Sequence, residues 1–346
     1  MSRDLHNGPP LLALTMGDPA GIGPEVIVRA LVQGLHAPTV VVGDVAVMRR
    51  AVSQCGLLMP VLMVEQPRDA LLAPAHAAVV WTPPALRAQG TSEALAALTM
   101  GRIDARAGAA AACCIEAAAG LALGGEVAAL VTAPIHKEAL SAAGVHHPGH
   151  TEMLQAAAGG VPVRMMLANE ELRVVLVTIH VALRKAIEAL DFDAVLQTLR
   201  IAHRAASAWG QRAPRIAVAG LNPHAGEGGL FGDEELRFIG PAVQAARAEG
   251  IDARGPFPPD TVFMRARHAP GHAGEFDLVV SMTHDHGLIP VKYLGVEQGV
   301  NVTLGLPFVR TSPDHGTAFD IAGSGRADPS SFIAAATMAQ RLLQPA

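Results

Sequence analysis

The stretch LLALTMGDPAGIGPEVIVRAL, residues 11–31, passes from an apolar run through a glycine-rich turn into a segment with helical spacing. The apolar run is typical of a buried strand. Pro24 suits the first helical position, and Glu25 suits the first turn of a helix. The stretch lacks the third glycine of the G-x-G-x-x-G pattern. It therefore predicts a strand, a turn and a helix, in which the turn either approaches an anion or cofactor or is a plain tight turn.

The same succession of strand and helix continues along the chain. Apolar runs bounded by turn residues predict buried strands at 11–17, 39–44, 78–82, 128–134, 173–180, 215–222, 277–285 and 299–306. Good helix formers fill most of the intervals, as in 93–123 and 192–209. This alternation predicts an α/β fold with mainly parallel sheets. Because 346 residues exceed one ordinary core, we expect two domains.

The amino-acid composition indicates which kind of partner the protein is expected to bind. The net charge is -5 and the basic residues are spread singly, which favours neither nucleic acid nor a membrane surface as a partner, so we expect a small molecule. We expect no apolar run long enough to span a membrane and no leader-like segment in residues 1–18, so the predicted location is cytoplasmic. The three cysteines suit neither a disulfide framework nor a C-x-x-C metal site.

Histidines recur where predicted strands end. His180 ends the fifth predicted strand, His224 lies in a glycine-rich loop after the sixth, and His284 and His286 end the seventh. In an open α/β sheet the carboxyl ends of the strands gather ligands, and three imidazoles suit a divalent transition metal. Their wide separation in sequence leaves the alternative open that each is an ordinary structural or surface histidine.

Lysine is scarce, since only Lys137, Lys185 and Lys292 occur among 26 basic residues. Lys137 and Lys292 lie in motif-like segments, where a compact ammonium serves better than a planar guanidinium. Chance retention is the alternative.

Two further segments carry donors for a phosphate or carboxylate group. HPGHTE contains His150 and Thr151, and the glycine-rich segment 309–329 contains Arg310. Thr151 also suits a helix N-cap, and the two roles are compatible.

Seven segments together resemble the 4-hydroxythreonine-4-phosphate dehydrogenase family of pyridoxal phosphate biosynthesis. They are LTMGDPAGIGPE (14–25), TAPIHK (132–137), PGHTE (148–152), GLNPHAGEGG (220–229), GPFPPDTVF (255–263), HDHGLIPVK (284–292) and VNVTLGLPFVRTSPDHGTAFDIAG (300–323). Within the first and last segments, GDPAGIGPE and HGTAFDIAG are also similar to motifs of the isocitrate and isopropylmalate dehydrogenase group. The resemblance covers nearly the whole chain and follows the motif order of the family.

The resemblance implies two α/β/α domains of the isocitrate and isopropylmalate dehydrogenase type. We expect a discontinuous first domain, 1–130 with about 300–346, and a second, 131–299, that carries the metal-binding and dimer-forming segments. It also implies a homodimer whose active site is shared between subunits. One divalent metal is expected on His180, His224 and His284, with zinc favoured over magnesium, manganese or cobalt.

The remaining implied roles concern substrate and cofactor. Substrate contacts are expected from His150, Thr151, Lys292, Asn301 and Arg310. The implied dinucleotide is NAD, with NADP as the alternative, and its expected contacts are Gly21, Gly23, His315, Gly316 and Asp320. An aspartate on the adenine ribose accepts from the 2′-hydroxyl and repels a 2′-phosphate, which favours NAD.

The implied reaction is metal-assisted oxidation of the secondary alcohol of 4-phosphooxy-threonine, followed by decarboxylation of the 3-oxo acid. Lys292 is the expected proton donor or substrate anchor, and Asp285 is expected to orient a ligand or relay a proton.

Three departures from the family pattern keep other substrates open. His136 replaces an asparagine, Thr283 a tyrosine and His286 a glutamine, and GLIPVK resembles a second branch that acts on 4-phosphorylated threonate or erythronate. A more distant relative oxidises a carboxylated cyclohexadiene diol. A phosphatase built on the same histidines and a binding protein without turnover are alternatives from other classes.

Overall fold

The structure is a computed structural model that describes residues 9–74, 76–90, 92–208, 213–295 and 297–344. Residues 1–8, on which the expected absence of a leader partly rests, and Trp209, the last residue of a predicted helix, lie outside the described residues. The chain divides into two compact units, 1–161 with 306–343 as unit 1, and 162–305 as unit 2. Residues 131–161 thus group with unit 1, whereas the sequence placed them in the second domain. The domain boundaries expected from the sequence, at about residues 130 and 300, stay a prediction.

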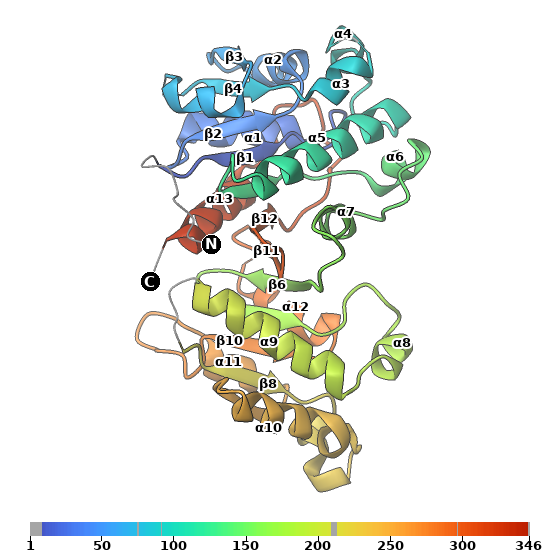
Figure 1. Cartoon of the computed structure of the whole chain (residues 1–346), viewed down its shortest axis with the longest axis vertical. Coiled ribbons are helices and arrows are strands. Elements are labelled where there is room, and N and C mark those ends of the chain that lie inside the picture. The colour runs from blue at the N-terminus through green and yellow to red at the C-terminus, as the bar shows by residue number, and fades with distance from the viewer. Residues whose placement is uncertain (1–8, 75, 91, 209–212, 296, 345–346) are drawn as a thin grey trace. The chain divides into compact units, whose positions relative to one another are not determined.

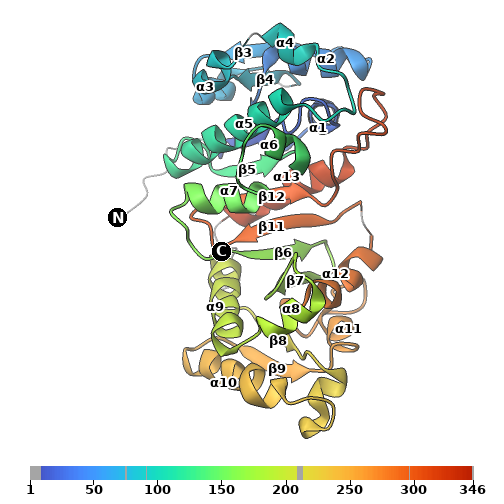
Figure 2. The same cartoon turned by 90° about the vertical axis from the view of Figure 1, so that its right-hand side faces the viewer.

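Unit 1 is an α/β unit with parallel strands in the order β3-β4-β2-β1-β5-β12 (Figures 1 and 2). Its elements are β1 Leu12–Thr15, α1 Gly23–Gln33, β2 Thr39–Val42, α2 Val45–Gln54, β3 Val61–Val64, η1 Pro67–Leu72, β4 Ala78–Trp81, α3 Pro84–Ala88, α4 Ser92–Ala96, α5 Ala105–Leu123, β5 Ala129–Thr132, α6 Lys137–Ala142, α7 His150–Ala157, β12 Val309–Pro313 and α13 Ser330–Leu343.

Because crossovers between parallel strands are nearly always right-handed, the strand order of unit 1 implies helices on both faces of its strands. The connection through α1 runs from β1 to β2, whereas the connection through α5 runs in the opposite direction, from β4 to β5. Crossovers of one hand that run in opposite directions lie on opposite faces. Accordingly, α1 packs with α2 and α13, while α5 packs with α6 and α7.

Helix α5 corrects one sequence expectation. Its 19 residues have the length and composition of a membrane span, although no such run was predicted. Buried residues make up 67% of its apolar window, and it packs on β1 and β5. Cys113 and Cys114 are buried there as small side chains. The helix is therefore a core helix of unit 1.

Unit 2 has strands in the order β11-β6-β7-β10-β8-β9. Its elements are β6 Arg164–Ala168, β7 Arg173–Leu176, α8 Leu183–Glu188, α9 Phe192–Ala208, β8 Ile216–Ala219, η2 Pro223–Gly229, η3 Glu235–Ile239, α10 Gly240–Ala248, β9 Ala253–Phe257, α11 Val262–Ala266, β10 Leu278–Ser281, α12 His284–Tyr293 and β11 Val300–Leu304. Strands β7, β10, β8 and β9 are parallel, and β6 is antiparallel to both β7 and β11.

The core of unit 2 forms where α11 and α12 cover the strands. Leu176, Val279 and Val291 are fully buried there, and Phe276 is 2% exposed. Gly287 lets α12 approach β7, because a Cβ at this position would lie 2.4 Å from Leu176. Helices α9 and α10, which pack on each other, belong to crossovers that run in the direction opposite to that of α11. Both units are thus α/β, which confirms the predicted fold class.

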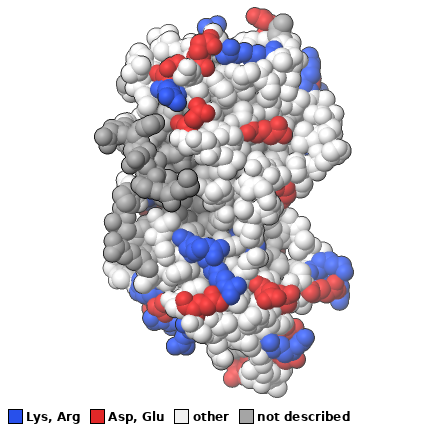
Figure 3. Space-filling view, viewed as in Figure 1, with Lys and Arg blue, Asp and Glu red and all other residues white. Residues whose placement is uncertain are grey.

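On the face drawn in Figure 3, acidic and basic side chains are interspersed over both units, and neither sign forms a continuous patch.

Candidate active site

Two predicted metal ligands, His180 and His284, lie side by side in unit 2. They follow β7 and β10, which pair in parallel with Ser281 opposite Leu176, so both chain segments leave the same edge of the strands. The imidazole centroids are 5.6 Å apart and the rings are tilted by 51°. The parallel pairing therefore brings together two imidazoles, of His180 and His284, that are 104 positions apart in the sequence.

Asp285 holds the ring of His284. Its Oδ1 lies 2.7 Å from His284 Nδ1, so this nitrogen carries the hydrogen that is shared with the carboxylate. Nε2 is then the ring nitrogen that does not face Asp285. A carboxylate that orients an imidazole in this way is typical of histidines that bind metal ions. The catalytic and orienting roles expected for Asp285 stay a prediction.

His224 lies in a turn of unusual backbone. From His224 to Gly228 every φ is positive, with values of 53° at His224, 52° at Ala225 and 44° at Glu227. The left-handed conformation costs roughly 1–2 kcal/mol for each residue other than glycine. Such outliers persist only where the surrounding structure holds them, and they concentrate at functional sites.

Glu235 holds the segment that leads into this turn. The carboxylate is 4% exposed, and it accepts from the backbone N–H groups of Leu221, at 2.7 Å, and Asn222, at 2.8 Å. The side-chain amide of Asn222 also donates to Glu235, at 2.9 Å, and to Glu234, at 2.7 Å. These bonds stabilise the entry to the strained turn, although sequence reasoning assigned no role to Glu235.

The three histidines do not form one group. In the described part of the chain, no three His, Cys, Asp or Glu side chains lie close enough together to hold a metal ion. His180 and His284 are paired, and His224 is not part of that pair. Two neutral imidazoles fit a transition ion such as Zn²⁺ in donor type. The set of three ligands stays a prediction.

Lys292 and Asn301 belong to the same unit. Lys292 lies in the last turn of α12, the helix that His284 begins, and it is half-buried. Asn301 lies on β11 opposite Leu167 and is also half-buried. His286 is half-buried, and its Nδ1 is a buried atom with no hydrogen-bond partner in the structure.

Unit 1 contains a buried cation, Arg310. Its side chain lies on β12 and is 3% exposed, and Nη2 donates to Thr132 Oγ1 at 2.7 Å. Burial lowers the pKa of Arg310 to about 10, while the nearby Glu152 raises it. The guanidinium is therefore still charged at neutral pH.

His150 begins α7 and is kept neutral. Burial is the main cause that lowers its pKa well below 6.5, and the charge of Arg310 adds to this effect. The ring also forms a hydrogen bond with the backbone of Ala133, while Nε2 is buried and has no partner. A cation beside a neutral imidazole is suited to an anionic group that also carries a hydroxyl or amide hydrogen.

Thr151 is the second residue of α7, because the helix begins at His150 with Gly149 as its N-cap residue. The expected N-cap role of Thr151 is therefore wrong. Gly149 takes the N-cap position, because His150 is already the first residue of the helix.

The glycines of the first loop have packing roles. A Cβ at Gly21 would lie 3.0 Å from the Thr317 side chain, and one at Gly23 would lie 2.4 Å from the Met16 carbonyl oxygen. The N–H of Ile22 donates to the carbonyl of Thr317 at 3.1 Å. The loop after β1 thus packs tightly against the segment after β12, which is the pair of segments that was expected to hold the dinucleotide.

Glu25 binds the far end of that second segment. Its buried carboxylate accepts from the backbone N–H groups of Gly323 and, at 2.9 Å, Gly325. His315 Nδ1 lies 3.0 Å from the carbonyl oxygen of Gly316, and both Gly316 and Asp320 are exposed. The expected cofactor residues therefore lie on two segments: Gly21 and Gly23 after β1, and His315, Gly316 and Asp320 after β12.

His136 and Asp18 lie at the same edge of unit 1. The His136 ring stacks on Phe319, with centroids 4.6 Å apart and planes 17° from parallel. Asp18 is fully buried; its N–H donates to the carbonyl of Pro134 at 2.9 Å, and its Oδ2 has no partner. Burial raises the pKa of Asp18 to about 6, while the Ala20 N–H and His136 lower it.

Known proteins resemble this chain in sequence and in fold. The family described as pyridoxal phosphate biosynthetic protein PdxA matches residues 35–339. A 4-hydroxythreonine-4-phosphate dehydrogenase of Beijerinckia indica is 54% identical over 96% of this chain and 95% of its own length.

The chain belongs to the PdxA family.

A D-threonate 4-phosphate dehydrogenase of Pectobacterium atrosepticum is 45% identical over 96% of this chain and 99% of its own. The crystal structure of 4-hydroxythreonine-4-phosphate dehydrogenase from Klebsiella pneumoniae aligns with a TM-score of 0.87 at 43% identity, covering 98% of this chain and 100% of that one. The PdxA assignment confirms the resemblance inferred from the motifs.

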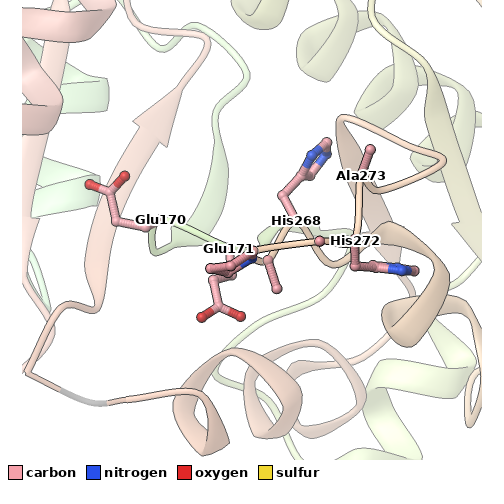
Figure 4. Close-up of a pocket in the computed structure, with 8 residues that line it drawn as sticks. Glu170, Glu171, His268, His272 and Ala273 are labelled. Carbon is pink, nitrogen blue, oxygen red and sulfur yellow. The ribbon is translucent and has the colours of Figure 1, made fainter.

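This PdxA chain also has a shallow surface pocket in unit 2, lined by Glu170, Glu171 and residues 268–273. The labelled acidic and histidine side chains point in different directions there (Figure 4). Glu171 pairs with Arg267, and His268 Nε2 lies 2.9 Å from the carbonyl oxygen of Phe276. None of the predicted site residues lines this pocket.

Sequence reasoning missed several residues that position the PdxA candidates. Thr132, Glu25 and Glu235 appear in quoted motifs or beside them, but only their contacts reveal what they hold. Thr132 ends β5, Glu25 lies in α1 and Glu235 begins η3, and a single buried polar side chain gives no periodic signal in any of these elements.

Proposed function

We propose that this protein is a nicotinamide-dependent dehydrogenase that oxidises the secondary alcohol of a 4-phosphorylated hydroxy acid. The observation that carries the proposal is the His180–His284 pair, with its rings 5.6 Å apart, in a chain of the PdxA family. Relatives that match over nearly the whole chain are named as dehydrogenases of such substrates.

The first candidate substrate is 4-phosphooxy-threonine, as in the name of the relative with 54% identity. Oxidation at C3 places a carbonyl beta to the carboxylate, so the 3-oxo acid can lose CO₂ with the electrons passing to the carbonyl. The second candidate is D-threonate 4-phosphate, or the erythronate analogue. It is favoured by the 45% identical relative and by Thr283 and His286, which depart from the biosynthetic motif.

The proposed anion contacts are Arg310, His150 and Thr151. The buried guanidinium supplies the charge, and the neutral His150 ring supplies a hydrogen-bonding nitrogen without a second charge. Lys292 and Asn301 are the other proposed substrate contacts. Lys292 is also the proposed proton donor, since an ammonium can return a proton to the carbon that loses CO₂.

His180, His224 and His284 are the residues that would hold a divalent metal, with zinc favoured and magnesium, manganese or cobalt as alternatives. Such an ion, when bound, supplies a positive charge that lowers the pKa of the alcohol. The hydrogen bond between Asp285 and His284 orients the imidazole for this purpose.

The proposed cofactor is NAD, bound by Gly21, Gly23, His315, Gly316 and Asp320, with NADP as the alternative. The exposed carboxylate of Asp320 favours NAD by charge repulsion with a 2′-phosphate. Faster turnover with NADP would contradict this preference. A homodimer with a shared active site and a cytoplasmic location are also part of the proposal.

The test is NADH formation with 4-phosphorylated hydroxythreonine, threonate and erythronate, before and after removal and return of the metal. We expect turnover with at least one of these substrates. Chelation should abolish this turnover, and addition of the metal should restore it. Phosphate release without dinucleotide would instead favour a phosphatase. Tight binding of the substrates without turnover would favour a binding protein.

A further inference from the structure

We propose that Thr132 is a positioning residue, whose hydroxyl fixes the guanidinium of Arg310 beside His150 so that the two side chains receive one anionic group. The inference rests on the proposed function, because that function supplies the phosphorylated substrate. Thr132 belongs to none of the residues expected to contact substrate, metal or cofactor.

The register of the strands brings the two side chains together. In the parallel pair β5–β12, Arg310 lies opposite Leu130, and Thr311 lies opposite Val131. Side chains alternate between the two faces of a strand, so Arg310, Leu130 and Thr132 share a face. Thr132 is then the diagonal neighbour of Arg310, within reach of a long side chain. The contact is therefore a consequence of register and joins residues 178 positions apart.

The contact is buried and short. Arg310 Nη2 donates to Thr132 Oγ1 at 2.7 Å, and Thr132 and Arg310 are 0% and 3% exposed. A charged donor that is buried needs acceptors in fixed directions, because water does not replace a missing one. The Thr132 hydroxyl supplies one such acceptor, and it fixes the plane of the guanidinium on that side.

Ala133, the residue that follows β5, anchors the other member of the pair. The His150 ring forms its hydrogen bond with the backbone of Ala133, and Nε2, which is buried, has no partner. Thr132 and Ala133 thus hold Arg310 and His150 from one strand end. An anion that meets both side chains requires both to be placed, so the position of one guanidinium nitrogen bears directly on affinity.

The alternative is that Thr132 only fills space in the sheet. Thr15 offers a matched control, because it is paired with Thr132 in the β1–β5 register and is also 0% exposed. Its Oγ1 has no hydrogen-bond partner in the structure. Removing the Thr15 hydroxyl changes the same amount of buried polar surface without touching Arg310.

The experiment uses the full-length protein with Thr132→Val, Thr132→Ser and Thr15→Val. Binding of inorganic phosphate is measured by calorimetry, and KM and kcat are measured with the phosphorylated substrate. For Thr132→Val we expect the phosphate Kd and the KM to rise about tenfold, or 1.4 kcal/mol. We expect kcat to stay unchanged, since binding rather than chemistry is altered. Thr132→Ser and Thr15→Val are expected to bind phosphate like the wild type.

Several results would overturn the inference. The first is that Thr132→Val binds phosphate as tightly as Thr15→Val. The second is that Thr132→Ser loses as much phosphate affinity as Thr132→Val. The third is that Thr132→Val lowers kcat and leaves KM unchanged. If Thr132→Val does not fold, Thr132→Ala replaces it in the same comparison with Thr132→Ser. A wild type that reduces no dinucleotide refutes the proposed function, while the phosphate titration still decides the role of Thr132. A wild type that binds no phosphate contradicts the inference itself.

Discussion

The candidate residues of the two units are held in different ways. In unit 1, Arg310 is buried, bonded to Thr132, and accompanied by a His150 whose pKa is lowered by burial. In unit 2, His180 is exposed, and His284 is half-buried and oriented by one exposed carboxylate. Burial and a hydrogen bond fix Arg310 in unit 1, whereas the two imidazoles of unit 2 lie nearer the surface. Variants in the two units should therefore fail in different ways.

The largest effect is expected from the imidazoles of unit 2. Replacing His284 by alanine should lower NADH formation on the order of 10³-fold, because a metal charge contributes several kcal/mol to the transition state. Metal content after dialysis, measured by mass spectrometry, should fall with it. The exposed His272 of the same unit, changed to alanine, is the control. If the His284 variant kept the metal content and the activity of the wild type, His284 would not be a ligand of a metal ion that turnover requires.

The next effect is expected in unit 1, from Arg310→Met. Loss of this buried, hydrogen-bonded charge, the proposed substrate contact, should raise KM about 100-fold while kcat changes less. Initial-rate kinetics over a range of substrate concentrations measure this. Arg106→Met is the control, because Arg106 forms an exposed ion pair with Asp104, and such pairs contribute little. An unchanged KM would show that the buried cation does not meet the substrate.

In unit 1, the buried carboxyl group of Asp18 should make the free energy of unfolding depend on pH. Burial raises the pKa of Asp18 from 3.8 to about 6, so the folded protein binds this proton more tightly than the unfolded chain. The resulting stabilisation is fully present below pH 3.8 and is lost as the pH rises through 6. The loss is on the order of 2–3 kcal/mol.

Urea unfolding between pH 4.5 and 7.5 checks this, with Asp18→Asn expected to flatten the decline. Asp260→Asn, at an exposed position, should leave the pH profile unchanged. The same slope in the Asp18 variant as in the wild type would assign the decline to other groups.

The smallest effect is expected from Asp285→Asn in unit 2. The hydrogen bond to His284 orients the ring, and loss of such a partner costs about 10–100-fold in metal affinity. Competition with a chromogenic chelator measures this affinity. Glu188→Gln, which removes an exposed ion pair with Lys185, serves as the control. Equal affinity in both variants would mean that the imidazole is oriented by its backbone alone.

Much of the fold could be predicted from local pattern. All eight strands expected from apolar runs exist, because a strand buried on both faces requires an apolar run of its own. They are β1, β2, β4, β5, β7, β8, β10 and β11. Strands β3, β6, β9 and β12 were missed. Strand β9 contains Gly255 and Pro256, and β12 carries the buried polar residues Arg310, Thr311 and Ser312. Apolar periodicity gives no signal for strands of this composition.

The sequence by itself determined the succession of strands and helices, the residue types available at strand ends and the family. Only the tertiary structure decided which of these residues meet: His180 with His284, Arg310 with Thr132, and Glu235 with the segment that enters the His224 turn. The physical reason is that hydrophobic periodicity and turn chemistry act over a few residues. Strand register and crossover direction instead bring together side chains from distant positions, and burial then sets their charge and partners.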